Sequence, residues 1–271
     1  SFQPDEVSRF LNKEAAKATI VCTTHCETST GALHPLEEIA GLARAKGKLV
    51  LADVITSLGV HPVRFDAWGL DAAVAGSQKG LMLPPGLAFV ALSEAAWERS
   101  KTAKLPKFYL DLTKARSNIL KNSTPFTPGI PLVLALEESL RLMQAEGLEA
   151  IFARHQRHAD ACRTAVRAWG LELFAAVPAN GLTAVRAQSG KDAQEVVKVL
   201  REKHGMRIAG GQEPMKGKMF RLGHMGHYTD TDVADLVAAT QATLIELGWT
   251  ENTSGASEAA RMLGVSPAVG A

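Results

Sequence analysis

The sequence has few of the features that mark secreted, membrane or nucleic-acid-binding proteins. It contains only three cysteines, Cys22, Cys26 and Cys162, whose spacing fits no metal motif and whose odd number does not suit a disulfide framework. The formal net charge of +2 is too small to favour nucleic acid or an anionic membrane. Charges and glycines interrupt the apolar runs well short of a membrane span, and no signal-peptide pattern opens the chain. We therefore expect a soluble, cytoplasmic enzyme or binding domain without a nucleic-acid or membrane partner.

The composition and pattern that are present indicate an α/β protein. The chain has 271 residues, of which 46% are hydrophobic and 21% charged, as in ordinary globular proteins. Strand-like and helix-like stretches alternate, which is typical of a layered α/β architecture. In the first half we expect strands at 18–23, 48–53, 72–75 and 87–92, and helices at 4–11 and 34–46. The second of these helices has Pro35 in its first turn and Gly47 at its end.

A loop rich in Pro, Thr and Ser at 122–131 precedes two long helical patterns, at 132–147 and 148–169. We interpret the second half as a smaller domain and place the division between 1–145 and 146–271. Its expected strands lie near 183–187, 206–209 and 219–222, and its expected helices near 193–204 and 231–247. Residues from about Glu251 onward are rich in Ala, Gly and Ser, and this predicts a partly mobile tail.

Lys79 and Asp53 form the most informative pair. Lys79 follows the apolar run Ala72–Ala75 through a Gly-Ser turn, so it can be held out of bulk water, which favours the nucleophilic amine. Asp53 ends the apolar strand that begins near Leu49, and a carboxylate there can hold a cationic ring nitrogen. An amine beside such an acid is the arrangement that pyridoxal phosphate chemistry requires. The alternative is a surface lysine in a turn and a solvated carboxylate at a strand end.

Four segments, in order along the chain, carry a family resemblance: Thr24–Gly31, Ala52–Ser57, Leu70–Lys79 and Lys218–Gly226. Together they resemble the class V, fold-type I aminotransferases, and they are most similar to the alanine–glyoxylate and serine–pyruvate group. The resemblance extends from about residue 4 to about residue 249. It implies a mainly parallel sheet sandwiched by helices, incomplete at its N-terminus, plus a smaller C-terminal α/β domain. The family has a long segment before the position of Ser1, so the chain is expected to be N-terminally truncated.

The resemblance also implies roles for individual residues. Lys79 would bind the aldehyde of pyridoxal 5'-phosphate as an imine and would carry the proton at the substrate α-carbon. Asp53 would keep the ring nitrogen protonated. Thr28 would lie near the phenolic oxygen of the cofactor, although a Thr/Ser loop can equally bond its own backbone. Ser77 and Gln78 flank the lysine and would either donate to the phosphate or serve only as turn residues.

Two further residues are implied to bind ligands. Arg221 would clamp the substrate α-carboxylate, because a guanidinium matches a carboxylate through two N–H groups. The alternative for Arg221 is a salt bridge at a domain interface. Thr127 would reach the cofactor phosphate of the neighbouring subunit in a homodimer, with nearby Thr124 as the other possible register.

Three other groups of residues resemble sites less closely. His155 and His158 are three apart with Asp160 close by, but Arg154 and Arg157 interleave with them, and we expect a solvated helix face. His224 and His227 share this spacing in a Gly-rich turn that has no cysteine or carboxylate close in sequence. Cys26 beside His25 suggests a nucleophile pair, but adjacent side chains usually point apart.

These observations favour a transaminase that moves an amino group between a small amino acid, such as alanine or serine, and a 2-oxo acid, such as glyoxylate or pyruvate. Two alternatives remain open. The chain is an inactive truncated remnant or subunit with a structural or interaction role, or it is a pyridoxal-phosphate-dependent lyase or desulfurase. No metal site is expected.

Overall fold

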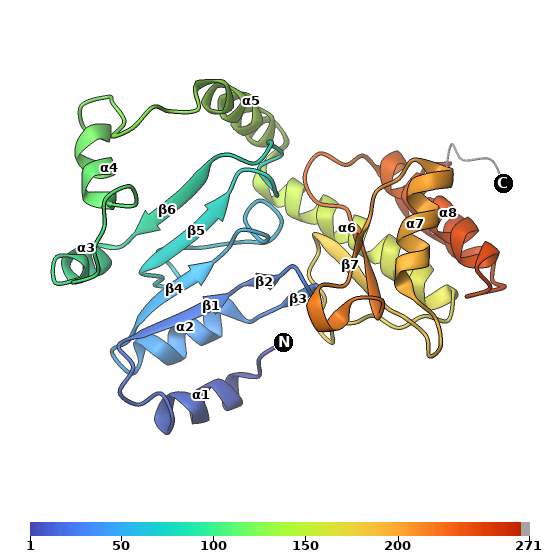
Figure 1. Cartoon of the computed structure of the whole chain (residues 1–271), viewed down its shortest axis with the longest axis horizontal. Helices are drawn as coiled ribbons and strands as arrows, with labels where there is room; N and C mark the ends of the chain where they lie inside the picture. Colours follow the sequence, from blue (N-terminus) through green and yellow to red (C-terminus); the bar gives the residue numbers. More distant parts are fainter. Residues whose placement is uncertain (267–271) are drawn as a thin grey trace.

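A computed structural model describes residues 1–266 of the chain. Within this range the chain folds as an α/β protein with a four-stranded sheet in its first half and a three-stranded sheet in its second half. The long helices α5 (Ile130–Glu146) and α6 (Leu148–Ala168) connect the two halves (Figure 1). None of the helices in the described range is both long enough and apolar enough to cross a bilayer.

The first sheet aligns the strand ends that carry the predicted site residues. Its order is β1 (Ile20–Thr24), β4 (Leu49–Asp53), β5 (Ala72–Gly76) and β6 (Ala88–Leu92). The first three strands are parallel, and β6 is antiparallel to β5. The register pairs Thr24 with Asp53 and Asp53 with Val74. Ligand sites lie outside the carboxyl ends of such strands, and these ends point toward the second half of the molecule (Figure 1).

Apolar spacing explains the packing of helix α2 (Leu36–Arg44) on this sheet. The side chains of Leu36, Ile39, Ala40 and Ala43 recur every three to four residues and are buried on the strand side of the helix. Helix α1 (Pro4–Asn12) contacts α2 and buries Leu11. Pro35 is the N-cap of α2 and not part of its first turn, so the helix begins two residues later than the sequence predicts.

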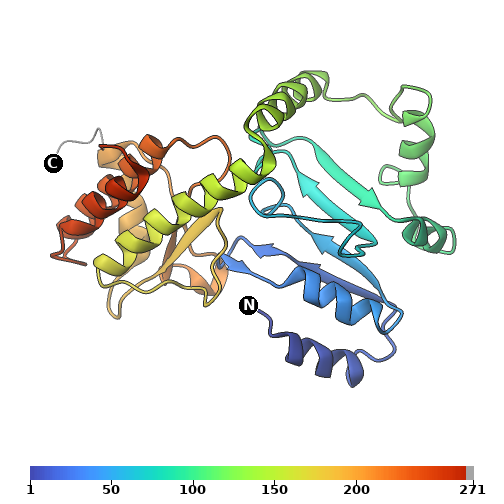
Figure 2. The same cartoon turned by 180° about the vertical axis from the view of Figure 1, so that it is seen from behind.

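Beyond the sheet, the first half carries the two-stranded hairpin β2 (Cys26–Glu27) and β3 (Ala32–Leu33). It also carries α3 (Glu94–Ser100) and α4 (Leu112–Ile119), which lie at the outer end of the sheet, away from the second half (Figures 1 and 2). The remaining elements of the second half are β7 (Leu182–Arg186), α7 (Ala193–His204), β8 (Ala209–Gly210), a short 3-10 helix (Glu213–Met215), β9 (Met219–Gly223), α8 (Asp230–Glu246) and α9 (Ser254–Leu263).

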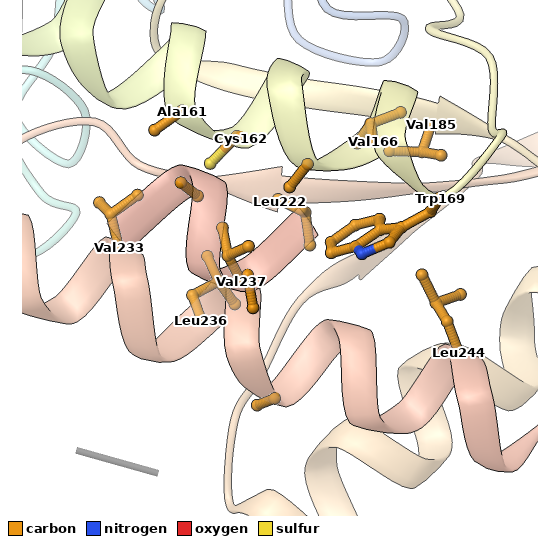
Figure 3. Packing of buried hydrophobic residues seen from close by; sticks show 14 of the residues in the cluster. Ala161, Cys162, Val166, Trp169, Val185, Leu222, Val233, Leu236, Val237 and Leu244 are labelled. Carbon is orange, nitrogen blue, oxygen red and sulfur yellow. The ribbon is translucent and has the colours of Figure 1, made fainter. Parts of the chain in front are cut away.

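The second half is organised around a core between α6, α8, α9 and the β7–β9 sheet. Trp169, 2% exposed, lies among Val166 of α6, Leu222 of β9 and Leu244 of α8 (Figure 3). Such a buried indole contributes a large apolar area, and its Nε1 donates to the Gln241 side chain at 3.0 Å. This core holds β9 in place, and with it the predicted clamp residue.

Backbone hydrogen bonds join the two halves directly. The N–H of Leu33 donates to the carbonyl of Val177, and the N–H of Ala179 donates to the carbonyl of Gly31. The N–H of Asn180 donates to Nε2 of His61 at 2.9 Å. The β2–β3 hairpin is therefore fastened to the 177–180 loop, beside the carboxyl ends of the first sheet.

The predicted elements are confirmed to within about two residues in most places, and α7 matches at both ends. One prediction is wrong: the part of the chain expected to be a mobile tail contains α9, which packs on α6 and buries Ala259 and Leu263. A second expected feature is shorter than predicted, since the strand near 206–209 is reduced to β8, Ala209–Gly210.

Candidate active site

A cavity of about 550 Å³ lies where the carboxyl ends of the first sheet meet the second sheet, and Thr28, Lys79 and Arg221 all line it. The rest of its lining comes from Leu182, residues 206–209, Gly223, Met225, Tyr228 and the first turns of α8. The volume lies within the range of about 300–1,000 Å³ found for small-molecule sites. Three residues that the sequence predicts, from three distant segments, are therefore brought together.

The turn after β5 fixes the position of Lys79. The hydroxyl of Ser77 donates to the carbonyl of Pro84 at 2.8 Å and accepts from the N–H of Leu87 at 3.2 Å. The carbonyl of Lys79 accepts from the N–H of Met82. A Cβ on Gly80 would lie 2.2 Å from the carbonyl oxygen of Leu58, so only glycine fits directly after the lysine. The turn is thus constrained on both sides of Lys79.

Thr28 is held at the cavity by contacts from both halves of the chain. Its hydroxyl lies 2.5 Å from the hydroxyl of Thr56, which is in the turn that follows β4. Its carbonyl accepts from Nη1 of Arg221 at 2.8 Å. The loop around it is further ordered by the N–H of Ser29, which donates to the Glu27 carboxylate. The side chain of Ser29 is the main cause that lowers the pKa of the Glu27 carboxyl, and this backbone hydrogen bond lowers it further.

Asp53 is beside the cavity but does not line it. One carboxylate oxygen accepts from the N–H of Ile55 at 2.9 Å, as in a strand-end turn. Its other oxygen accepts no hydrogen bond from the described residues. The backbone carbonyl of Asp53 accepts from the N–H of His25, which holds the Thr28 loop next to the end of β4.

Arg221 divides its N–H groups between the fold and the cavity. Its Nε and Nη2 both donate to the carbonyl of Gly210, at 3.1 and 2.8 Å, and its Nη1 donates to Thr28. A guanidinium has five N–H groups, so these three bonds leave two, one on each terminal nitrogen. Burial lowers the pKa of Arg221, and the nearby Glu27 carboxylate opposes this shift. Two parallel N–H groups are what a bidentate carboxylate contact requires.

The other predicted residues are not in this cavity. Ser77 is fully buried, and its hydroxyl makes hydrogen bonds within the turn. Gln78 is exposed beside the lysine. Thr127 is exposed on the loop before α5, and the hydroxyl of nearby Thr124 donates to the carbonyl of Phe126.

The expectation of a solvated helix face at His155 and His158 is wrong. The two residues are 1% and 0% exposed, because the 224–228 loop contacts His155 and the start of α8 contacts His158. Nδ1 of His155 donates to the carbonyl of Ile151, and Nε2 accepts from the N–H of Gly226 at 3.0 Å. The spacing of Ile151, His155, His158 and Cys162 places all four on one helix face, a signal that the interleaved arginines obscured.

His155 and its neighbour hold one wall of the cavity. Arg154 donates through Nη1 to the carbonyl of Gly226, so two adjacent residues of α6 bind both polar groups of the same glycine. Gly226 has a φ of 89°, which favours glycine, and it lies beside the carbonyl of Lys79. Burial lowers the pKa of His155 to about 4, so the imidazole is neutral and can accept from Gly226.

The other nucleophile and metal candidates also have structural explanations. Cys26 is buried, and burial raises the pKa of its thiol to about 12, so it is not a reactive thiolate. His224 is fully buried, and its Nε2 contacts the hydroxyl of Thr183 at 2.9 Å. Among residues 1–266, no group of three or more His, Cys, Asp or Glu side chains is arranged to hold a metal ion.

Comparison with known proteins identifies the family. The model of the class-V aminotransferases matches residues 2–236, and the chain belongs to this family. It is 48% identical over 263 residues to the small subunit of a soluble hydrogenase of Synechococcus sp. (strain PCC 6716), covering 95% of this chain and 68% of the relative. It is 39% identical to an L-aspartate–glyoxylate aminotransferase of Paracoccus denitrificans (strain Pd 1222), covering 84% of this chain and 59% of the relative.

Solved structures agree with this assignment. A pyridoxamine–pyruvate aminotransferase from Mesorhizobium loti matches with a TM-score of 0.90 and 28% identity, covering 97% of this chain and 69% of the other. An alanine–glyoxylate aminotransferase from Nostoc sp. matches with a TM-score of 0.84 and 34% identity, covering 90% and 66%. The chain therefore has the fold of the fold-type I aminotransferases, spans about two thirds of such chains, and is a pyridoxal-phosphate-dependent aminotransferase by family.

The residues that line the cavity, together with Asp53 beside it, fit this cofactor. Lys79 offers an amine, Thr28 a hydroxyl, and Asp53 a carboxylate oxygen that accepts no hydrogen bond from the described residues. The remaining N–H pair of Arg221 offers a place for a substrate carboxylate in the same cavity.

Proposed function

We propose that this chain carries out transamination between a small amino acid, such as alanine or serine, and a 2-oxo acid such as glyoxylate or pyruvate. The observation that carries the proposal is that Lys79 and Arg221, from different halves of the chain, line one cavity. Pyridoxal phosphate, when bound, supplies the electron sink for a carbanion at the substrate α-carbon. The remaining requirements fall on side chains of the protein.

In this proposal Arg221 binds the substrate carboxylate through its two remaining N–H groups and so orients the α-carbon toward Lys79. The Lys79 amine attaches the cofactor and later moves the proton at the α-carbon. Asp53 binds the ring nitrogen, and Thr28 donates to the phenolic oxygen. Gln78, exposed beside the lysine, contributes to phosphate binding.

The proposal includes a homodimer in which Thr127 of a second copy completes the phosphate site. The loop that carries Thr127 lies between α4 and α5, which expose much apolar surface. We also propose that 1–145 and 146–271 are the two domains, each with its own sheet. A reducing, cytoplasmic location agrees with the free thiols of Cys22, Cys26 and Cys162.

The experiment that tests the proposal is a titration of the purified protein with pyridoxal phosphate, followed by borohydride reduction and peptide mapping. We expect a visible absorption band and a reduced label on Lys79. The Lys79→Ala variant should lose both, whereas Lys203→Ala, which removes an exposed lysine paired with Glu246, should keep both. Amino transfer from alanine or serine to glyoxylate should then depend on Lys79. A label spread over surface lysines would contradict the proposal.

A second candidate function is a subunit role in a larger assembly. Two relatives, at 48% and 45% identity, are named as subunits of soluble hydrogenases. In that case the exposed apolar surface of α4 and α5 would bind another polypeptide, and the cavity would not be used for catalysis. If the wild-type protein binds pyridoxal phosphate and transfers amino groups, and substitution of Lys79 abolishes the transfer, a subunit role is excluded as the sole function. A lyase or desulfurase would consume the amino acid without any 2-oxo acid present, which the same assay detects.

A further inference from the structure

Thr56 makes a contact with the cavity residue Thr28 that the proposed mechanism does not use. It is 3% exposed and follows β4 in a turn closed by hydrogen bonds from the N–H groups of Ser57 and Leu58 to the carbonyl of Val54. Its hydroxyl oxygen lies 2.5 Å from that of Thr28. In the sequence, the segment Ala52–Ser57 is notable for Asp53. Nothing in the sequence connects Thr56 with a residue 28 positions earlier.

The direction of this hydrogen bond follows from the donors and acceptors that each threonine hydroxyl offers. Each threonine has one hydroxyl hydrogen and two acceptor lone pairs. Among the described residues, the Thr28 oxygen is the only hydrogen-bond partner of the Thr56 hydroxyl. A buried O–H that donates to nothing has lost the hydrogen bond that it would make to water, which is unfavourable. Thr56 therefore donates to Thr28, and the hydrogen of the Thr28 hydroxyl must point elsewhere.

The remaining freedom of Thr28 is small. Arg221 holds its carbonyl, and the Ser29–Glu27 hydrogen bond holds the next peptide. A β-branched side chain is stiff about χ1. The direction of the hydroxyl hydrogen of Thr28 is then the main freedom left to this side chain. Thr28 lines the cavity, whereas its partner Thr56 is not among the lining residues.

We propose that Thr56 is a positioning residue that donates its proton to Thr28 and thereby makes Thr28 a donor toward an anionic oxygen in the cavity. The inference rests on the proposed function, in which that oxygen is the phenolic oxygen of pyridoxal phosphate. Thr56 itself does not touch the ligand. Its role is to set which of the two hydroxyls donates into the cavity.

The test compares a substitution that removes the hydroxyl of Thr56 with one that keeps it. Thr56→Val keeps the shape and removes the donor, and Thr56→Ser keeps the donor. Ser57→Ala is the matched control, because Ser57 is buried in the same turn and its hydroxyl binds the carbonyl of Val54, not Thr28. Each protein is titrated with pyridoxal phosphate to obtain a dissociation constant, and the visible spectrum of the bound cofactor is followed against pH.

We expect Thr56→Val to weaken cofactor binding about tenfold, since one hydrogen bond to a charged group is worth on the order of 1.5 kcal/mol. The pH at which the bound cofactor loses its proton should rise, because its anionic oxygen loses a donor. Thr28→Val should show both changes, and the double variant should show little more. Thr56→Ser and Ser57→Ala should resemble the wild type.

The inference is overturned if Thr56→Val matches Ser57→Ala in both dissociation constant and pH midpoint, or if Thr56→Ser is as weak as Thr56→Val. Circular dichroism checks the fold of each variant, and Thr56→Ala replaces Thr56→Val if the latter does not fold. If the wild-type chain binds no pyridoxal phosphate, the proposed function fails first and the inference fails with it. If the wild type binds pyridoxal phosphate and Thr56→Val has no effect, the inference about Thr56 is rejected and the proposed function is not.

Discussion

At the residue scale, the chemistry of the cavity depends on how polar groups are shared between the fold and a ligand. Arg221 uses three N–H groups for backbone carbonyls and keeps two. Thr28 receives hydrogen bonds at both its carbonyl and its hydroxyl. Both residues are therefore held in place before any substrate arrives, which lowers the entropy cost of binding.

Arg221→Lys should raise the KM for the amino acid by about tenfold or more and lower kcat less. A lysine ammonium can replace the charge but not the pair of parallel N–H groups. Steady-state kinetics with alanine or serine measure the change in KM and the change in kcat separately. Arg186→Lys, at a half-exposed arginine of β7, is the control and should leave both constants near those of the wild type. An unchanged KM in Arg221→Lys would remove Arg221 from substrate binding.

Gly80→Ala should impair cofactor attachment through strain alone. Its Cβ would lie 2.2 Å from the Leu58 carbonyl oxygen, which is backbone and cannot move aside cheaply. We expect the turn to shift Lys79 and cofactor affinity to fall at least tenfold, with lower thermal stability. Gly41→Ala is the matched control, because a Cβ there meets nothing within 4 Å and helix α2 should gain slightly from alanine. Equal behaviour of the two variants would contradict this account of the turn.

Sequence alone predicts the residues whose chemistry is local. Asp53 ends a strand of the first sheet, and Lys79 and Thr28 lie in the segments that follow two neighbouring strands, whose carboxyl ends meet at one edge of a parallel sheet. Thr56 and His155 could not be found in this way. Their partners, Thr28 and Gly226, are 28 and 71 residues away, and only the packed structure brings them into contact.

At the element scale, α6 connects the two cores and holds the cavity wall. Its residues Arg154 and His155 bind Gly226, and His158 contacts the carboxylate of Asp230 at the start of α8. Farther along, Cys162 and Val166 enter the core around Trp169 (Figure 3). The same helix thus stabilises the fold at one end and shapes the candidate site at the other.

Acid should destabilise the protein through its buried histidines. Burial lowers the pKa of His155 to about 4 and that of His61 to about 3. The unfolded chain binds these protons near pH 6.5, so the free energy of unfolding should fall as the pH drops from 6.5 toward 4. Each such histidine should contribute a loss of about 2 kcal/mol between pH 6.5 and 5, from about 1.4 kcal/mol per pH unit.

Urea denaturation at pH 7.5 and pH 5.0 measures this effect. His61→Gln keeps an acceptor for the N–H of Asn180 and should reduce the difference between the two pH values by about 2 kcal/mol. His204→Gln, at the end of α7, is the control and should leave the difference as in the wild type. A difference that does not change in His61→Gln would show that His61 is not held neutral by the fold.

Capping residues explain why some elements are predictable and others are not. The ends of α7 follow from Asp192, whose carboxylate accepts from the N–H of Gln194, and from Gly205 in the left-handed region. Helix α9 has no side-chain cap, and its Ala, Gly and Ser composition is typical of a flexible tail. It forms a packed helix because Ala259 and Leu263 are buried in the C-terminal core, which is tertiary information.

At the scale of the whole molecule, one region differs from the rest in its lack of burial. Helix α4 buries none of its residues, and α5 buries only Ser139 and Met143. Between residues 105 and 134 the exposed apolar side chains include Leu105, Phe108, Tyr109, Leu110, Ile119, Leu120, Ile130, Val133 and Leu134. Exposed apolar surface of this extent marks an interaction site.

The proposed homodimer predicts that this surface is covered in solution. Ile119→Glu with Leu120→Glu, at side chains 67% and 81% exposed, should convert a dimer into monomers without loss of the fold. Sedimentation equilibrium measures the mass, and Met262→Glu, at a partly exposed position of α9, should remain dimeric. A monomeric wild type would contradict the homodimer and would favour a different partner for this surface.

The hydrogen bond from Arg221 to Thr28 also limits how the protein can change by mutation. One side chain joins β9 to the first half of the chain and, in the proposed function, recognises the substrate. A mutation of Arg221 removes both the contact between the two halves and the binding of the substrate carboxylate. Substrate specificity therefore cannot change gradually through substitutions at this position. We expect saturation mutagenesis, scored separately for protein abundance and for turnover, to show Arg221 depleted in both scores and Gln78 in turnover alone.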